Sequence, residues 1–346
     1  MKLFWKNIGK NSYALLLPVF LFLSTLLIGG SVKAAAVKPD QRVWESLFQL
    51  EDIRSLSFSG SVSYAGKARA SFTDLLVDPN VLNKKTTPKY ETVIVDFNGG
   101  NQILTPTESQ SWFTFSTKTS DKKAPSFGME IRSVGSKAYV ALTGGTNLPA
   151  ELSGYLNTWV QLDFDWLLKD LNLGVLLANK TGVQNRSDAE KAEMQRMRSA
   201  ILKSKTLTIR SKNIQKINGV YFDVYSFSVN KNNLKKLLAA DSGVSGRSLT
   251  ARQLSNLQKE IAAVKNVTGK IWVNKKDNLP YQINITAIGV QPKEKTSIQI
   301  LLKDFNQPVV VSEPTKFVTL EELFTQLFPG MPSVIATTTP TSSVNW

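Results

Sequence analysis

Apolar and polar residues alternate repeatedly between Val220 and Pro314, and this alternation constrains the fold more than any other feature of the sequence. Three runs show it, at Tyr225–Val229, Tyr281–Ala287 and Ile298–Leu302. Because successive side chains of a strand point to opposite faces, each run predicts a strand with one face buried and the other in water. The polar residues Asn274–Asn278 precede the second run and predict a hairpin turn.

The same alternation occurs earlier, most regularly at Leu56–Tyr64, where every second residue from Ser55 to Ser63 is serine. Helical spacing and capping residues separate the strands. Strands flank the helical blocks, which predicts one continuous antiparallel sheet with helices on one face rather than two domains. The other expected strands lie at 93–97, 111–117, 127–134, 137–143, 159–164 and 207–209; the expected helices begin at Asp40 (as the N-cap), Asp165, Ser187, Asn230, Thr250 and Thr319.

The composition excludes several classes of chemistry. The chain contains no Cys and no His, which removes disulfides, thiol nucleophiles, the commonest general base and the commonest metal ligand. No nucleotide-binding or calcium-loop motif occurs. We therefore expect no catalytic residue, no metal site and no cofactor.

The N-terminal segment 1–36 has the pattern of a secretory signal peptide. Lysines precede an apolar run at Tyr13–Ile28, and small residues at Ala34–Ala36 follow it. An uncleaved N-terminal membrane anchor is the alternative. The expected organisation is then a single domain at 37–330 and a disordered tail, rich in Thr, Ser and Pro, at 331–346.

The net charge of +15 attracts polyanions without specifying which. An extracytoplasmic location, whether secreted or membrane-associated in the cell envelope, disfavours nucleic acid. It leaves anionic lipid headgroups and envelope polymers as partners.

The order of elements in the last third resembles a known family. A strand of the form G-x-Y-x-x-Y-x-F-x-V at Gly219–Val229 leads into Leu-rich helices. A hairpin at Gly269–Ile283 and a closing strand that ends at Asp304–Val309 follow, with a weaker echo in Lys137–Val140 and Trp159–Leu162. This order is similar to that of the LppX/LprG-type lipid-binding lipoproteins, bacterial relatives of the carriers LolA and LolB. The resemblance implies an α+β fold, a half-barrel whose helices pack on the concave face. The family's lipobox Cys is absent here, which excludes attachment through an acyl group.

The resemblance and the residues together predict a monomeric, non-catalytic lipid transport protein. It would hold an acyl chain of a lipid or lipoconjugate between sheet and helices, at a membrane surface. The expected cavity lining consists of Phe58, Val62, Leu168, Leu171, Tyr225, Phe227, Leu237, Ile283 and Ile285. The lysine pairs Lys235–Lys236 and Lys275–Lys276 are expected to form a rim for anionic headgroups.

Three alternatives remain open from the sequence. The same apolar residues could form a solid core without a ligand. The protein could be a surface scaffold or adhesion module that binds a protein or polysaccharide without a cavity. An enzyme would have to rely on carboxylates alone, with Asp163 and Asp165 as the candidates.

Overall fold

The structure is a computed structural model that describes residues 38–68, 89–105, 108–120, 126–135, 137–148, 153–163, 188–241, 255, 258–259 and 261–327. The expected signal segment 1–36 and tail 331–346 lie outside the described residues. The expected helix after Asp165, with Leu168 and Leu171, also lies outside them, as does most of the helix after Thr250.

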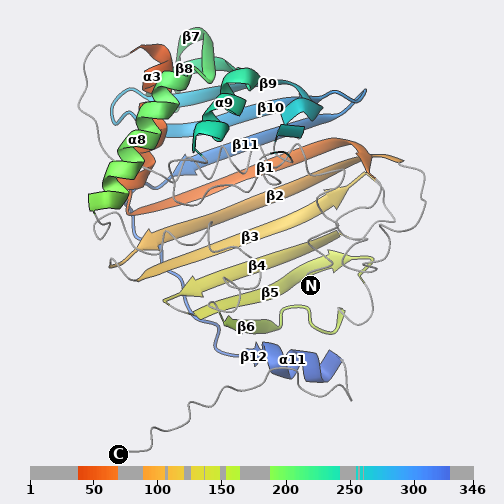
Figure 1. The fold of residues 1–346 in the computed structure, drawn as a ribbon. Coiled ribbons are helices and arrows are strands. Elements are labelled where there is room, and N and C mark those ends of the chain that lie inside the picture. The colour runs from red at the N-terminus through yellow and green to blue at the C-terminus, as the bar shows by residue number, and fades with distance from the viewer. Residues whose placement is uncertain are drawn as a thin grey trace, which may run out of the picture.

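One 12-stranded sheet dominates the molecule, in the order β12-β6-β5-β4-β3-β2-β1-β11-β10-β9-β8-β7 (Figure 1). Strands from the two halves of the chain meet where β1 pairs with β11, with Phe58 opposite Leu302. The strands are β1 (Ser55–Ala68), β2 (Lys89–Ile103), β3 (Ser109–Thr119), β4 (Ser126–Val134), β5 (Lys137–Thr146), β6 (Trp159–Asp163), β7 (Leu207–Ile217), β8 (Val220–Val229), β9 (Val264–Asn274), β10 (Pro280–Gly289), β11 (Lys295–Lys303) and β12 (Val318–Thr319).

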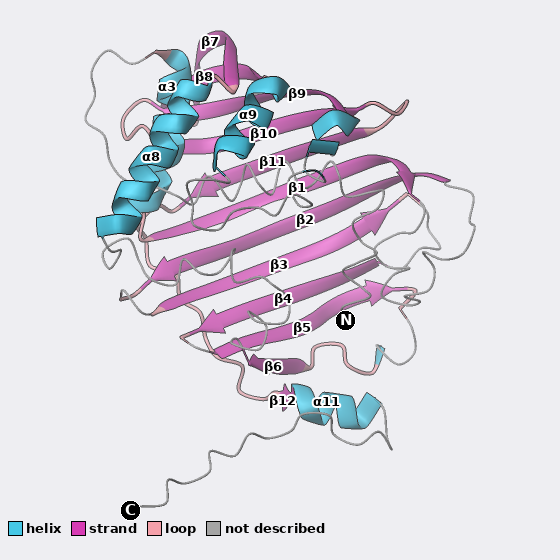
Figure 2. Cartoon of the chain, in the orientation of Figure 1, coloured by secondary structure: helices cyan, strands magenta, loops and turns pink. Residues whose placement is uncertain are grey.

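The helices of the described part are few and small beside this sheet. α3 (Pro39–Phe48), α8 (Asp188–Ser204) and α9 (Lys231–Asp241) lie together over the β7–β11 end of one face (Figure 2). A 3₁₀ turn, η1 (Gln49–Asp52), follows α3. α11 (Leu320–Leu327) lies at the opposite edge, beside β6 and β12.

The expected α+β half-barrel, with an antiparallel sheet and helices packed across its concave face, is therefore wrong. The sheet is open and mixed, because β12 runs parallel to β6, with Val318 opposite Val160. After β11 the chain crosses the sheet instead of turning back, so β12 arrives in the same direction as β6. The described helices also cover only part of the sheet, because α3, α8 and α9 lie together at its β7–β11 end.

The two faces of the sheet differ in chemistry. We call the side that carries Phe58, Tyr225 and Ile283 the apolar face, and the side that carries Ser59 and Ser61 the polar face; strand pairing joins each set across the sheet. The main core lies on the apolar face beneath the helices. There, α3 contributes Val43, Trp44, Leu47 and Phe48, and α8 contributes Ile201.

Most local signals in the sequence behave as expected. The Asn230 side chain accepts hydrogen bonds from the amides of Asn232 (3.1 Å) and Asn233 (3.2 Å) at the start of α9. Thr319 and Glu322 form the expected capping box, with distances of 2.6 and 3.2 Å. Asp40 differs from the expectation: α3 begins at Pro39, so Asp40 lies in the first turn instead of capping it.

A segment of the chain at residues 304–317, here called the strap, crosses the polar face at one end of strands β1–β5. Its backbone is held mostly by side chains of those strands, and its own residues Val309 and Val311 are buried. The contacts are Arg54 N to Asn306 Oδ1 (2.9 Å), Ser55 Oγ to Gln307 O (2.6 Å), Val309 N to Gln102 Oε1 (2.8 Å), Gln110 Nε2 to Val309 O, and Arg132 Nη1 to Ser312 O (3.1 Å).

Candidate functional site

Four of the expected cavity residues lie in the solid part of the core. Tyr225, Phe227, Ile283 and Ile285 are between 0% and 5% exposed. They share one cluster with the buried side chains of α3. At this end of the molecule, the space between sheet and helices is therefore filled by the protein's own side chains.

The other expected lining residues lie around this cluster. Leu237 on α9 is partly buried and packs against it. Phe58 and Val62 on β1 also contact the cluster but are only half-buried, because they lie where the described helices end. These two residues connect the filled end of the apolar face to a second region.

The expected lysine rim is divided between two ends of the strands. Lys275 donates its backbone N–H to Tyr221 at the start of β8 (3.1 Å). Lys235 and Lys236 belong to α9, which begins immediately after the end of β8. Because a ten-residue strand is roughly 30 Å long, the two pairs do not form one rim.

The second region consists of apolar side chains on the apolar face of β1–β6. The pairing registers place Phe58, Phe113, Ile131, Val140 and Val160 in one row across these strands, and Phe97, Phe115, Met129 and Leu142 in the adjacent row. Val62 and Val95 pair in a third row, and Leu162 lies in a fourth, two residues from Val160. All of them are half-buried, in contrast to the core under α3. The rows, here called the apolar band, comprise Phe58, Val62, Val95, Phe97, Phe113, Phe115, Met129, Ile131, Val140, Leu142, Val160 and Leu162.

Phenylalanine rings form a continuous ladder through the first four strands of this band. The Phe58 ring centroid lies 6.4 Å from that of Phe97 and 6.1 Å from that of Phe113. Phe113 then contacts Phe115 at 5.9 Å, and Phe115 meets Phe127 edge-on at 5.7 Å. These separations are typical of favourable aromatic pairs, so the ladder forms a stiff apolar surface.

Two glycines let the ladder lie close to the sheet. A Cβ atom on Gly60 would lie 2.8 Å from the ring of Phe97, and one on Gly99 would contact the ring of Phe58 at 2.5 Å. Each ring therefore covers the glycine of the neighbouring strand. The band itself carries no charged residue. Polar residues border it: Thr117 pairs with Val95, and Ser111 and Ser133 lie in the row that ends at Leu162.

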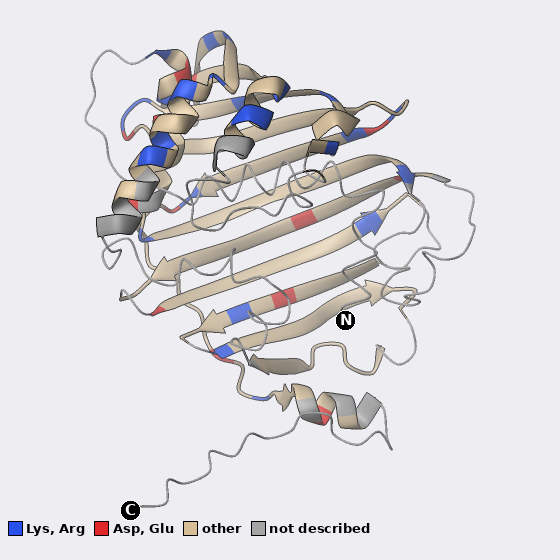
Figure 3. Ribbon diagram, viewed as in Figure 1, with Lys and Arg blue, Asp and Glu red and all other residues tan. Residues whose placement is uncertain are grey.

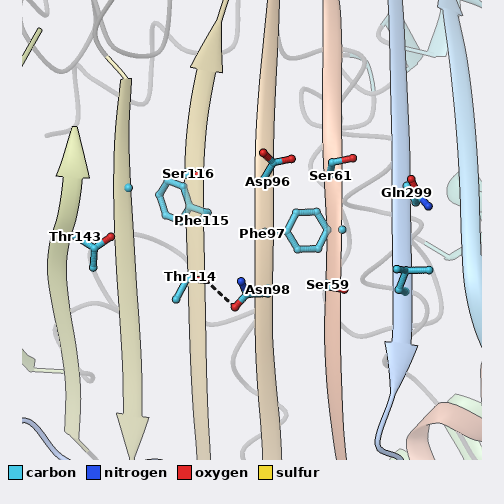
Figure 4. A pocket seen from close by; sticks show the side chains of 13 residues that line it. Ser59, Ser61, Asp96, Phe97, Asn98, Thr114, Phe115, Ser116, Thr143 and Gln299 are labelled. Carbon is cyan, nitrogen blue, oxygen red and sulfur yellow. Dashed lines mark hydrogen bonds between the residues drawn. The ribbon is translucent and has the colours of Figure 1, made fainter. Parts of the chain in front are cut away.

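A hollow of about 510 Å³ lies on the opposite, polar face. Figure 4 shows its side chains side by side on neighbouring strands, with Thr114 donating a 2.8 Å hydrogen bond to Asn98 Oδ1. The lining residues with polar side chains are Ser59, Ser61, Asp96, Asn98, Thr114, Ser116, Thr143 and Gln299.

Charged groups next to this hollow occur in opposite pairs. Lys118 Nζ lies 2.8 Å from Asp96 Oδ2, and Arg132 Nε lies 2.8 Å from Glu130 Oε1. Arg132 also stacks over Trp159, 4.5 Å from the ring centroid. Figure 3 shows a red position on β2 beside a blue one on β3, and a second blue and red pair on β4. The hollow is thus polar but nearly balanced in charge.

An ion pair between a buried carboxylate and an exposed lysine lies at the far edge of the sheet. Asp223 on β8 is buried, and its Oδ2 atom lies 3.0 Å from Lys212 Nζ on β7. The hydrogen bond to Asp223 raises the pKa of Lys212, and burial raises the pKa of the neighbouring Tyr225. The pair links the last two strands of the sheet, β7 and β8.

Comparison with known proteins identifies no family. No family model matches the chain, and no curated protein matches its sequence. Among the described residues, no cluster of three or more Asp and Glu side chains could hold a metal ion. No described helix is both long and apolar enough to span a membrane.

The apolar band and the hollow were missed in the sequence, although part of their signal was present. Phe113 and Phe115 alternate with Trp112 and Thr114, which indicates a strand with one aromatic face. The alternating serines of β1 indicate that one side of this strand faces solvent. What the sequence did not reveal was the register that places these residues next to one another.

Proposed function

We propose that this protein is a non-catalytic, extracytoplasmic binding protein for the acyl chain of a lipid or lipoconjugate. The observation that supports the proposal is the apolar band, which remains half-buried while the core under α3 is closed. The proposed binding surface lies on β1–β6 and includes Phe58 and Val62. It does not include the filled region around Tyr225.

The band has the chemistry and size that an acyl chain requires. It spans six strands, which corresponds to roughly 24 Å across the sheet. Burying about ten methylene groups at ~0.8 kcal/mol each would contribute ~8 kcal/mol. This corresponds to about micromolar affinity before the costs of ordering the chain are subtracted.

The overall charge favours a lipid with an anionic headgroup. The net charge of +15 raises the local concentration of anionic lipid near the protein. Such attraction decreases with salt, whereas burial of the acyl chain does not. Binding should therefore retain its apolar component at high ionic strength.

The test uses the purified full-length protein and a fluorescent fatty acid, with native mass spectrometry to detect lipid that co-purifies. Phe113→Asn should weaken probe binding at least about ten-fold, since it removes the central ring of the ladder. Phe317→Asn is the matched control. Phe317 is exposed and packs on Tyr139, away from the band.

Thermal unfolding of each variant distinguishes loss of the site from loss of the fold. A wild-type protein that melts cooperatively, carries no lipid and takes up no probe would overturn the proposal. That result would instead support a scaffold or adhesion module with a solid interior. Equal losses in Phe113→Asn and Phe317→Asn would also contradict the proposal.

A further inference from the structure

The hollow on the polar face carries side chains whose chemistry differs from that of the apolar band. We propose that it binds a neutral, polyhydroxylated ligand, namely a glycan chain. Its polar side chains lie on the opposite side of the sheet from the Phe ladder, and Phe97 and Phe115 of the ladder also line it. The proposal rests on the shape of the hollow, the order of its polar groups and its charge balance.

The shape follows from small residues between larger ones. Ser61 pairs with Asp96, Asp96 with Ser116, and Ser116 with Gly128, which gives a row of short side chains across four strands. The strap stands at one end of the strands, where Gly100 allows Trp112 and Val309 to lie close to the sheet. The result is a trough that runs across the strands.

The polar groups form two parallel rows. In the first row, Ser59 pairs with Asn98, and Asn98 pairs with Thr114. The second row contains Gln299, Ser61, Asp96 and Ser116 in register. Because neighbouring strands lie about 4.8 Å apart, each row offers a hydrogen-bonding side chain at that repeat. A chain of linked polyol rings presents hydroxyl groups along its length and suits such a repeat.

The donors and acceptors alternate in a way that hydroxyl groups can match. The hydrogen bond from Thr114 Oγ1 to Asn98 Oδ1 fixes the amide of Asn98. Its NH₂ group is a donor, the Asp96 carboxylate is an acceptor, and the serine hydroxyls are both. An apolar ligand would leave these groups without partners, which is costly.

Charge decides between a neutral glycan and a polyanion. Asp96 belongs to the lining itself, and Glu130 lies opposite Thr114 at its margin. Their partners Lys118 and Arg132 compensate these two negative charges without exceeding them. A polyanion would approach two carboxylates here, whereas neutral hydroxyl groups would not be repelled. The local balance therefore differs from the strongly basic whole chain.

The experiment measures binding of defined probes to the full-length protein by calorimetry. The neutral probes are linear hexasaccharides of glucose with α-1,4 and β-1,4 linkages and of N-acetylglucosamine; the anionic probe is polygalacturonate. Ser61→Tyr fills the trough and should weaken binding of the neutral probe at least about ten-fold. Ser63→Tyr is the matched control, because Ser63 lies on the same strand and face but outside the lining.

Asn98→Ala provides a second variant without added bulk and should also weaken binding if Ser61→Tyr fails to fold. Binding of a neutral hexasaccharide that is lost in Ser61→Tyr or Asn98→Ala and kept in Ser63→Tyr supports the site. Absence of binding to every neutral probe overturns it, as does stronger binding of polygalacturonate. Equal effects of Ser61→Tyr and Ser63→Tyr overturn it too. The fluorescent fatty acid tests the apolar band separately, so failure of the glycan proposal would not count against the lipid proposal.

Discussion

Glycine 269 shows how a single missing side chain shapes this sheet. It lies on β9 directly beneath the ring of Phe227 on β8, its partner in the register. A Cβ atom at this position would also lie 2.5 Å from the backbone oxygen of Asn284. The same relationship recurs where Phe97 covers Gly60. At these two positions, a phenylalanine ring on one strand lies over a glycine on the neighbouring strand.

The replacement Gly269→Ala should lower the free energy of unfolding by about 1–3 kcal/mol, because backbone and ring must both shift to admit the methyl group. Denaturant unfolding of the purified protein measures the change. Gly144→Ala on β5 is the control, since a Cβ atom there meets nothing within 4 Å. Equal destabilisation by the two replacements would contradict the explanation.

For single residues, the sequence predicted the face of the sheet to which a side chain points, but it did not predict which residues pack against that side chain. Alternation correctly placed Tyr225 and Phe227 on one face and Ser226 on the other. It could not show that α3 would fill the space above them, because helical periodicity does not specify which strands a helix covers. The burial of Ile283 therefore emerged only from the assembled core.

The strap is held to the sheet by a few hydrogen bonds and by the buried side chains of Val309 and Val311. Glu313 Oε2 accepts hydrogen bonds from Tyr139 OH at 2.9 Å and from Lys137 Nζ at 3.1 Å. The hydrogen bond from Tyr139, and then the one from Lys137, lower the pKa of Glu313 below its ordinary value of 4.5. The carboxylate is thus the form that holds the strap.

Acid should therefore loosen this element. A group with a lowered pKa in the folded state stabilises above its ordinary pKa, and the contribution is lost as the pH falls through the lowered value. Amide-exchange protection of residues 306–317 should decrease between pH 6 and pH 3.5, after correction for intrinsic exchange rates. In Glu313→Gln, protection should already be lower at pH 6 and change little with acid. A pH response that persists in Glu313→Gln would refute this assignment.

The sequence predicted individual helices, strands and hairpins better than the path of the strap across the sheet. The hairpin of β9 and β10 and the capping of α9 depend on neighbouring residues, and both were predicted. The strap was instead expected as a strand end, because nothing near Val309 in the sequence indicates Gln102 or Gln110 as partners. Because the strap crosses the sheet, the strand that follows it, β12, pairs with β6 in parallel.

The whole sheet has two edges, and they are protected differently. The β12 edge is only two residues long and is accompanied by α11. The β7 edge is a full strand, and Ile214 is 61% exposed on it. Arg210, Lys212 and Lys216 lie along the same strand. Charged side chains on an edge strand discourage pairing with another chain.

Removing two of these charges should promote self-association. The double variant Arg210→Thr with Lys216→Thr should form dimers or larger species in size-exclusion chromatography with light scattering, whereas the wild type should elute as a monomer. Lys270→Thr with Lys295→Thr removes the same charge from exposed positions on the interior strands β9 and β11. If both double variants associate equally, lower net charge is the cause and the edge explanation fails.

The pairing of β1 with β11 has a consequence for biosynthesis. Ser57 and Lys303 are neighbours in the sheet, but they lie far apart in the sequence. The ribosome must therefore synthesise most of the protein before this pair can form. A nascent protein that has emerged only as far as Gly289 holds β1 with one partner, β2, and displays its other side. Chains that terminate before β11 therefore leave one edge of β1 unpaired, and we expect them to aggregate more readily than the complete chain.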